Sequence, residues 1–136
     1  MYNLIKTSFT TKELKIKNNN IKPGKFKLNP QITRKTGKIK QNIYYTALIL
    51  KVKSTETSQF PVDLYVDFRG LFEFENIENE ENITEFLKFQ AVDIMYPYLR
   101  SIITNLTTTA MLPPIILPII DTSKLFNNDR KTTYIN

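Results

Sequence analysis

The chain has 136 residues, of which 41% are hydrophobic, and its 19 basic and 13 acidic side chains give it a formal charge of +6. A chain of this length buries roughly two thirds of its unfolded surface, which is enough for one hydrophobic core. It contains no Cys and no His, which excludes disulfides, thiol and imidazole nucleophiles and most transition-metal sites. The composition therefore predicts one domain that is not an enzyme and holds no metal or cofactor.

The charge is divided unevenly along the chain. Residues 1–53 carry thirteen basic side chains and one acid, Glu13, whereas residues 54–136 carry six basic and twelve acidic ones, so the halves have net charges of +12 and −6. Such asymmetry is typical of a basic arm that binds nucleic acid or anionic membrane. It is equally typical of two segments that lie against one another in the folded or assembled protein.

The sequence shows no export or membrane signal. Residues 1–10 lack a clean apolar stretch followed by a small-residue cleavage site. The most apolar run, residues 110–120, is far shorter than the ~20 residues of a spanning helix and contains three prolines. We therefore expect a cytoplasmic protein that does not insert into membranes.

The first third of the chain predicts weak strands. Residues 14–17 and 26–28 alternate apolar side chains with Lys, which indicates two short strands, and the intervening Asn-rich and Pro-Gly segments predict loops. Residues 33–41 contain Gly37 and four basic residues, and this composition predicts a mobile connection.

The clearest periodicity follows. Residues 43–53 are rich in β-branched and aromatic side chains, which favours a strand, and the polar residues 54–59 predict a turn into a second strand. From residue 60 to residue 75, apolar side chains fall on even positions and charged ones mostly on odd positions. This period of two predicts a strand with one buried and one solvated face, and Gly70 predicts a bulge in it.

The period changes after the acidic residues 75–81. Apolar residues from Ile83 to Leu106 recur at spacings of three and four, which predicts a long amphipathic helix that faces a sheet or a partner helix. Asn82 and Glu85 have the spacing of a capping box and predict the start of the helix. Pro97 predicts a kink or break, because it has no N–H to donate to the preceding turn.

The C-terminal part contains an apolar segment rich in proline, residues 112–120, which predicts an extended crossover. Asp121 begins a segment that predicts a cap and a short terminal helix carrying Leu125 and Phe126. Residues 127–136 are polar and predict a frayed tail. The expected organisation is one domain over residues 1–126 followed by this tail.

Several motifs in the second half occur together in one known family. Residues 96–100 read Y-P-Y-L-R, residues 112–117 read L-P-P-I-I-L, and Leu125-Phe126 follow at the family's spacing. Upstream, residues 69–72 read R-G-L-F where the family has a glycine-containing turn in its third strand. The order and spacing of these segments resemble the protein-export chaperone family SecB over about a hundred residues.

The resemblance implies an α+β fold, in which a four-stranded antiparallel sheet packs against a long kinked helix and a short C-terminal helix. It also implies a homo-oligomer, a dimer or a dimer of dimers, that holds unfolded polypeptides in hydrophobic grooves without ATP and serves protein export. For each groove position taken alone, packing in the core or in an interface is the competing interpretation. The implied client-binding residues are Phe26, Leu28, Met111, Leu112, Pro113, Ile115, Leu125 and Phe126.

The chain also departs from the pattern of the family. SecB proteins are usually acidic and pass clients to the SecA motor through acidic side chains on the open face of the sheet. The matching positions here include Tyr65 where the family has an acid, and Lys17 where it has another. These departures argue against SecA docking and leave open a specialised relative dedicated to one client, such as an antitoxin. The residues matched to motor docking are Glu13, Asp63, Tyr65 and Asp67.

A protein that binds nucleic acid is the alternative from a different class. The nine lysines between residues 12 and 40 have the charge to contact phosphates. Apart from Phe26, however, no aromatic residues are interleaved with them as stacking platforms. Lysines on exposed strand edges also discourage unwanted strand pairing, which explains their alternation without a ligand. The sequence therefore argues against nucleic acid as a partner.

Overall fold

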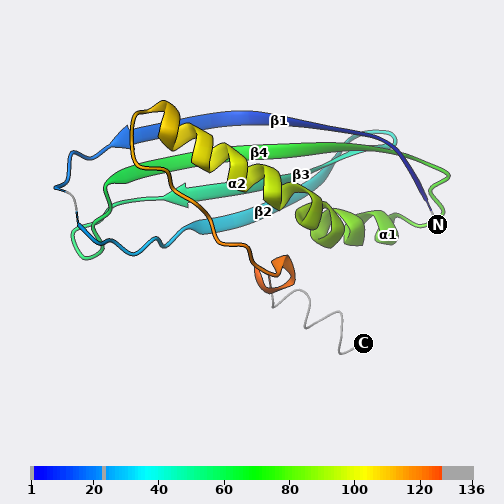
Figure 1. Cartoon of the computed structure of the whole chain (residues 1–136). Helices are drawn as coiled ribbons and strands as arrows, with labels where there is room; N and C mark the ends of the chain where they lie inside the picture. Colours follow the sequence, from blue (N-terminus) through cyan, green and yellow to red (C-terminus); the bar gives the residue numbers. More distant parts are fainter. Residues whose placement is uncertain (1, 23, 127–136) are drawn as a thin grey trace.

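The computed structural model describes residues 2–22 and 24–126 of the chain. Its four strands form one antiparallel sheet in the order β1-β4-β3-β2, and α2 runs obliquely across one face of this sheet (Figure 1). This arrangement confirms the predicted α+β fold class. The strands are β1 (Asn3–Asn18), β2 (Gln31–Lys40), β3 (Ile43–Val52) and β4 (Val62–Glu75). The helical segments are α1 (Glu80–Glu85), the π-helical η1 (Phe86–Gln90), α2 (Ala91–Thr109) and the 3-10 turn η2 (Thr122–Lys124).

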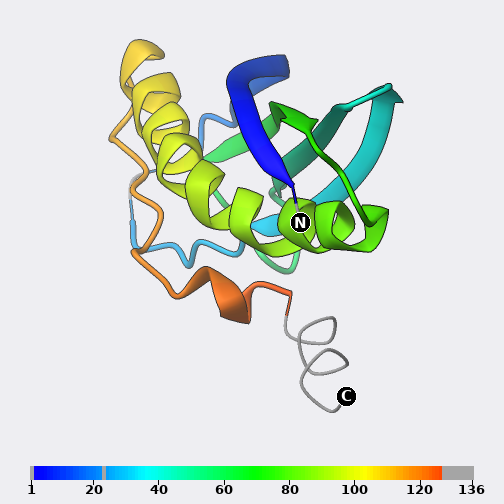
Figure 2. The same cartoon turned by 90° about the vertical axis from the view of Figure 1, so that its right-hand side faces the viewer.

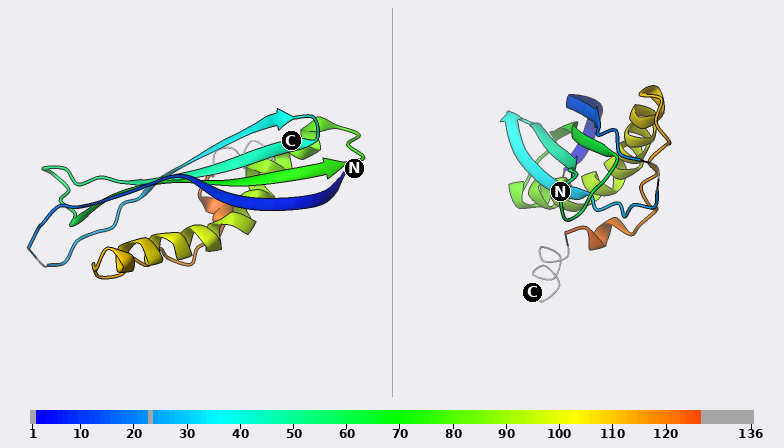
Figure 3. Two further views of the ribbon diagram at one scale, coloured as in Figure 1. Left: turned by 90° about the horizontal axis from the view of Figure 1, so that it is seen from above. Right: turned by 90° about the vertical axis from the view of Figure 1, so that its left-hand side faces the viewer.

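The molecule has two layers. Seen end-on, the sheet curves above the helices, and the helices and the crossover all lie on one side of it (Figure 2). The view from above shows β1 along the edge of the sheet and α2 beneath it (Figure 3). We call the side of the sheet turned away from α2 the open face. Within residues 2–22 and 24–126, none of the helices combines the length and apolar character that spanning a bilayer requires.

The core lies between the sheet and the helices, where the period of two in β4 places it. From Val62 to Phe74, every second residue of β4 faces the helical layer and is buried. Residues paired with them on β3, such as Leu48 opposite Phe68, face the same way. On the helical side, Met95, Leu99 and Ile103 are fully buried, as their spacing predicts.

The prediction of a bulge at Gly70 is wrong. Gly70 pairs regularly with Phe9 on β1 and Thr46 on β3, and the irregularities in the β1–β4 pairing fall elsewhere along β1. A Cβ atom at Gly70 would lie 3.0 Å from the Sδ atom of Met95 and 3.0 Å from the ring of Phe72. A side chain at this position would therefore have to push Met95 or the Phe72 ring aside, and the glycine lets α2 lie close to the sheet here.

Three predictions in the first third of the chain need correction. The strand predicted at residues 14–17 is the end of the 16-residue β1, and residues 26–28 form no strand. Residues 33–41 are not a mobile connection, since most of them belong to β2, which pairs with β3 at the edge of the sheet. Basic side chains and Gly37 are typical of an exposed edge strand. The same composition is also typical of a loop, so the sequence did not indicate the strand.

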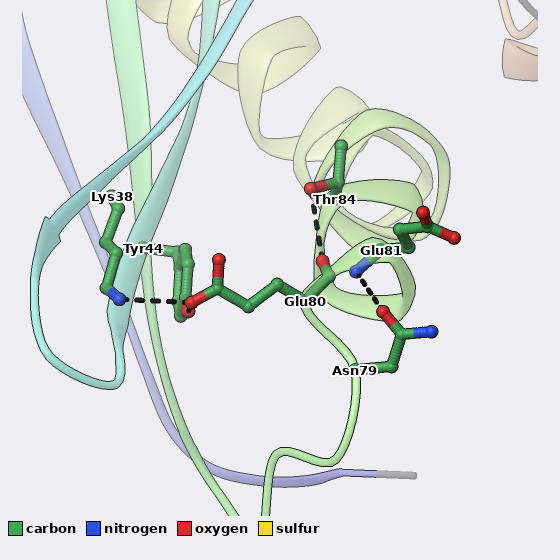
Figure 4. Close-up of polar contacts among 6 residues, drawn as sticks. All are labelled: Lys38, Tyr44, Asn79, Glu80, Glu81 and Thr84. Atoms are coloured by element: carbon green, nitrogen blue, oxygen red, sulfur yellow. Dashed lines mark hydrogen bonds and ion pairs between the residues drawn. The ribbon is translucent and has the colours of Figure 1, made fainter.

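The helical part begins three residues earlier than predicted. Asn79, not Asn82, is the N-cap, and its side-chain oxygen accepts a hydrogen bond from the backbone N–H of Glu81 at 2.9 Å (Figure 4). The carboxylate of Glu80 then lies 3.1 Å from the ammonium of Lys38 on β2, which raises the pKa of that lysine. The Tyr44 hydroxyl donates to the same carboxylate at 3.4 Å. The first helical turn is therefore tied to the sheet through Glu80.

The irregularity of the long helix lies in η1, and α2 continues through Pro97, so the predicted break at Pro97 is wrong. Pro97 and Asp93, four residues before it, both lie on the exposed side of α2. Because Pro97 has no N–H, the Asp93 carbonyl has no donor within the helix. This carbonyl lies on the solvent-exposed side of α2, where water can donate to it. In η1, the Lys88 carbonyl accepts a hydrogen bond from the Arg34 guanidinium at 2.7 Å.

The C-terminal predictions are confirmed for the crossover and the cap, but η2 is a single 3-10 turn that ends at Lys124, so Leu125 and Phe126 lie outside the helix predicted to carry them. Residues 113–120 form neither helix nor strand, and η2 follows them with Asp121 as its N-cap. The Thr122 hydroxyl donates to the carboxylate of Asp93, which fastens η2 to α2. The predicted polar tail, residues 127–136, lies outside the described residues.

The two oppositely charged halves of the chain meet in the sheet, as one interpretation of the sequence predicted. Lys6 and Lys17 on β1 lie opposite Glu73 and Asp63 on β4. The basic strand β2, however, pairs with β3 within the sheet, and it reaches the acidic half through the ion pair between Lys38 and Glu80 and through the hydrogen bond from Arg34 to the Lys88 carbonyl. Cross-strand neighbours of opposite sign stabilise such a sheet modestly.

Replacing Gly70 with Ala tests the close approach of α2 to the sheet. We expect the variant to lose about 1–3 kcal/mol of unfolding free energy, because the added methyl group must displace Met95 and the Phe72 ring. Gly24→Ala is the matched control, since a Cβ there meets the Phe26 ring at an ordinary 3.7 Å. Urea denaturation of both variants provides the measurement, and equal stability of the two would contradict this explanation.

Candidate functional site

A solvent-open groove of about 770 Å³ lies at one end of the molecule, between the sheet and the crossover. Such a volume is in the range that proteins use for binding ligands. Its walls come from the loop after β1, the residues that lead into β4, and the start of the crossover. Four of the eight predicted client-binding residues meet here: Phe26, Leu112, Pro113 and Ile115.

The wall next to the sheet is held in place by Asn19. Its backbone N–H donates to the carbonyl of Pro61 at 2.8 Å, and its side-chain amide donates to the carbonyl of Phe60 at 3.0 Å. The same amide donates to the Asp63 carboxylate at 2.9 Å. The corner before β4 is thereby fixed, and Phe60 stands edge-on to Phe26 with ring centroids 6.3 Å apart.

The crossover cannot join the sheet, because Pro113, Pro114 and Pro118 have no N–H to donate. Polar side chains of α2 hold it instead. The Tyr96 hydroxyl donates to the carbonyl of Pro118, and the Arg100 Nε donates to the carbonyl of Leu117, both at 2.9 Å. Burial raises the pKa of Tyr96. These bonds give the Y-P-Y-L-R motif a structural role that the sequence alone did not reveal.

Two threonines continue the same row toward the groove. The Thr104 hydroxyl donates to the carbonyl of Ile115 at 2.9 Å. The buried Thr107 hydroxyl accepts from the N–H of Ile115 at 3.0 Å and lies 3.1 Å from the carbonyl of Ile103. We call these four side chains the α2 ladder: Tyr96, Arg100, Thr104 and Thr107. The ladder forms hydrogen bonds with backbone groups along the inner edge of the crossover. These bonds hold the crossover in place as one wall of the groove.

The other four predicted client-binding residues do not line the groove. Met111 lies beside it, is 91% exposed, and has a backbone φ of 61°. Leu28, Leu125 and Phe126 are half-buried and pack against the core. The ring of Phe126 lies under the guanidinium of Arg34, 4.4 Å from the charged carbon.

The groove is also lined by apolar residues outside the predicted client-binding set. The sequence predicts Phe60 and Val62 on the buried side of a strand, Pro61 within the same strand, and Ile21 in a loop. The strand in fact begins at Val62, so Phe60 is released from the sheet and reaches the groove. The Pro61 that follows Phe60 was the available signal, because a proline is confined to the start or the edge of a strand.

The residues matched to motor docking lie together on the open face, but their carboxylates are engaged. Glu13 is 3.1 Å from the ammonium of Lys15, and the buried Asp67 accepts from the Arg69 guanidinium at 3.1 Å. Tyr65 is flanked by the strands that carry Lys15 and Lys51.

Asp63 is the most heavily bonded of these acids. It accepts from the backbone N–H of Ser54 at 2.8 Å and from Asn19, and the Lys53 ammonium lies 3.5 Å away. The hydrogen bond from Ser54, followed by those from Asn19 and the charge of Lys53, lowers the pKa of Asp63 below its ordinary value. Its carboxylate therefore closes the turn between β3 and β4 and joins this turn to the end of β1.

The architecture defines a class of protein: a binding module with an open apolar groove. Comparison with known proteins identifies the family. The family model described as preprotein translocase subunit SecB matches residues 8–133. The chain therefore belongs to the SecB family, whose members are chaperones and not enzymes.

Individual relatives agree with this assignment. A protein-export protein SecB from Buchnera aphidicola is 35% identical over 107 residues, which cover 77% of this chain and 72% of the relative. SecB from Anaplasma marginale is 25% identical over 140 residues, covering 84% and 80%. An uncharacterized protein of Methanocaldococcus jannaschii is 34% identical over 83 residues, covering 59% of this chain and 53% of that protein.

A solved structure has the same fold. It is the SecB-like chaperone of Mycobacterium tuberculosis in complex with a ChAD peptide from the HigA1 antitoxin. The TM-score is 0.72 at 16% identity, and the match covers 88% of this chain and 91% of that one.

Replacing Thr107 with Val tests the ladder at its buried end. The change preserves the shape of the side chain but leaves the Ile115 N–H without an acceptor, so we expect a loss of about 1–3 kcal/mol in unfolding free energy. Amide hydrogen exchange at Ile115 should accelerate in the variant. Thr108→Val is the control, because that hydroxyl bonds only to helix carbonyls on the exposed side. Unchanged exchange at Ile115 in the Thr107 variant would refute the role of the ladder.

The bonds of Asp63 predict a dependence of stability on pH. Its folded pKa is lowered, so its contribution is complete well above its ordinary value of 3.8 and is lost as pH falls through the folded value. Asp63→Asn should therefore be less stable than the parent chain near neutral pH, and this difference should shrink at about pH 3 and below. Urea titrations across this range provide the measurement, with Glu56→Gln as a surface control. A difference that does not change with pH would contradict the assignment.

Proposed function

We propose that this chaperone holds unfolded polypeptides without ATP, and that extended apolar segments of its clients bind in the groove between Phe26, Phe60 and the crossover. The proposal takes residues 1–126 as the working domain and places it in the cytoplasm. The observation that carries it is the groove itself, which gathers Phe26, Leu112, Pro113 and Ile115 at a solvent-open surface. Apolar surface is worth roughly 25 cal/mol per Å² when a client covers it.

The crossover supports this proposal because α2 hydrogen-bonds its inner edge and leaves its outer side open to solvent. Its inner edge is satisfied by the α2 ladder, while the side chains of Ile116 and Ile119 on its outer side are 66% and 84% exposed. Met111 extends this apolar surface from a left-handed backbone conformation, which is uncommon for a residue other than glycine. This conformation ends α2, because the N–H groups of Met111 and Leu112 donate to the carbonyls of Thr108 and Thr107, and it leaves the Met111 side chain 91% exposed. We therefore include Met111 among the client contacts.

Leu28, Leu125 and Phe126 have a different place in the proposal. They are half-buried against the core, and Phe126 is held by Arg34. In this position they offer a client less surface than the groove does. We propose that they become client contacts only for long segments that extend beyond the groove.

We also propose that the chain works as a homo-oligomer, a dimer or a dimer of dimers. The outer side of α2 exposes Ile94 at 39% and Tyr98 at 52%, and Tyr98 stacks on Phe9 of β1 with ring centroids 4.8 Å apart. The neighbouring edge strand β1 is 16 residues long and exposes Leu4 and Leu14. Long edge strands and adjoining apolar helix faces are covered in stable proteins, and a second copy supplies such a cover.

Service to one dedicated client is a second candidate. The related structure from Mycobacterium tuberculosis has a peptide of an antitoxin bound to it, which favours this reading for a protein of the same fold. A dedicated chaperone would protect one client tightly and unrelated proteins weakly. The proposal does not extend to SecA, because the carboxylates at the matched positions are engaged by Lys15, Lys53 and Arg69.

Replacing Phe26 with Ser tests the groove. We expect the variant to delay aggregation of a chemically unfolded test protein several-fold less well than the parent chain at equal concentration, because a client loses the ring that faces Phe60. Light scattering without nucleotide is the measurement, and two unrelated test proteins separate general from dedicated holding. Ile39→Ser is the control, as Ile39 is 53% exposed but lies in the β2–β3 hairpin region away from the groove. Equal protection by both variants would refute the groove as the client site.

Replacing Tyr98 with Asp tests the assembly surface. A charge on this side of α2 should shift the chain to a smaller species, since a buried unpaired carboxylate is costly at an interface. Sedimentation or light scattering after gel filtration gives the mass of each variant. Ile39→Asp, with nearly the same exposure, should leave the mass unchanged. A monomeric parent chain would contradict the proposed oligomer outright.

A further inference from the structure

A second groove, of about 960 Å³, lies on the open face of the sheet, where β1, β4 and β3 run side by side. The pairing register orders its side chains. Lys15 on β1, Tyr65 on β4 and Lys51 on β3 form one row across the three strands. Lys17 and Asp63 begin the next row, and Lys53 completes it through its ion pair with Asp63. Neighbouring strands are about 4.8 Å apart, so the lysines of one row flank a narrow central strip.

The lysines of this groove outnumber its carboxylates. Lys15 pairs with Glu13 at 3.1 Å, and Lys53 lies 3.5 Å from an Asp63 carboxylate that two other donors also use. Among residues 2–22 and 24–126, no carboxylate lies in ion-pair contact with Lys17 or Lys51. Tyr65 lies between Lys15 and Lys51 in the row and is uncharged, so neither lysine meets a carboxylate across the strands, and Lys15 keeps only its pair with Glu13 on its own strand.

The middle of the open face, beside this groove, is occupied by its own contacts. The Arg69 guanidinium is engaged by Asp67 and lies over the Tyr45 ring, 5.1 Å from its centroid. That ring in turn fills the space above Gly37, where a Cβ would approach it to 2.7 Å. The groove itself carries four lysines against two carboxylates, and Lys17 and Lys51 are its lysines outside any ion pair among the described residues.

We propose that this basic groove is a docking site for an extended acidic segment of a partner polypeptide. Carboxylates of such a segment form ion pairs with the lysines on either side of Tyr65. The aliphatic parts of the lysine side chains and the Tyr65 ring pack against the apolar side chains of the segment. A peptide can space its acids to avoid Glu13 and Asp63. A nucleic-acid strand carries a charge at every nucleotide and requires several stacking platforms, of which the groove has one.

The site is separate from the client groove. Val62 and Asp63 are consecutive on β4, and their side chains line the apolar groove and the basic groove respectively. The two surfaces therefore lie back to back at the same end of the sheet. Binding at the basic groove is consequently measurable whether or not the apolar groove holds clients.

The test measures binding of the full chain to a fluorescein-labelled peptide of alternating Glu and Ser by fluorescence anisotropy. We expect binding that weakens steeply between about 0.05 and about 0.5 M NaCl. The double variant Lys15→Glu, Lys51→Glu should weaken it by about tenfold or more, and Lys51→Arg should retain it. Lys35→Glu is the matched control, since Lys35 lies on the same face opposite Ala47 and away from the groove. Circular dichroism verifies that each variant is folded.

Two probes define the results that would overturn the proposal. A peptide of alternating Lys and Ser, or a single-stranded oligo(dT) of similar length, that binds as tightly as the Glu peptide would refute an acidic polypeptide as the occupant. Binding of the Glu peptide that the double reversal leaves intact, or that Lys35→Glu reduces equally, would refute the groove as its site. Amide NMR shifts confined to the strands around Tyr65 would support it.

Discussion

The crossover has no backbone donors at three of its positions, and the consequences of this constraint run through the structure. Prolines prevent residues 113–120 from extending the sheet, so the segment lies against α2 and depends on the α2 ladder. Because the ladder satisfies only the inner edge, the outer side chains stay uncovered. The same arrangement that stabilises the crossover thus leaves an apolar surface at the rim of the groove.

Much of the fold was predictable from periodicity. The period of two in β4 and the spacing of Met95, Leu99 and Ile103 each identify a buried face, and the structure confirms both. The failures have physical causes. Strand β2 carries one aliphatic residue on its inner side, Ile32, so its alternation is invisible against the basic residues of an exposed edge. The continuity of α2 through Pro97 depends on solvent reaching the preceding carbonyl, which no local sequence rule records.

The candidate site was only half predictable for a related reason. Residues close to a sequence motif, such as Leu112 and Ile115, were found with the motif. Phe60 was missed because its role depends on where β4 starts: Pro61 ends the strand pairing there, and Asn19, forty-one residues earlier in the chain, holds the Phe60 backbone through a hydrogen bond. The bonds of Asn19 and Arg100 are long-range contacts of polar side chains, which leave no periodic signal. The crossover wall and Phe26 were therefore predictable from the sequence, whereas Phe60 and the corner before β4 were not.

The central claim is that clients occupy the groove between Phe26, Phe60 and the crossover. The most direct measurement is photo-crosslinking to a permanently unfolded client, with benzoylphenylalanine placed at Phe60 and, in separate variants, at Tyr65 on the open face and Tyr98 on α2. The account predicts that the client crosslinks efficiently at position 60 and weakly at positions 65 and 98. Efficient crosslinking at position 65 or 98 with none at position 60 would contradict it.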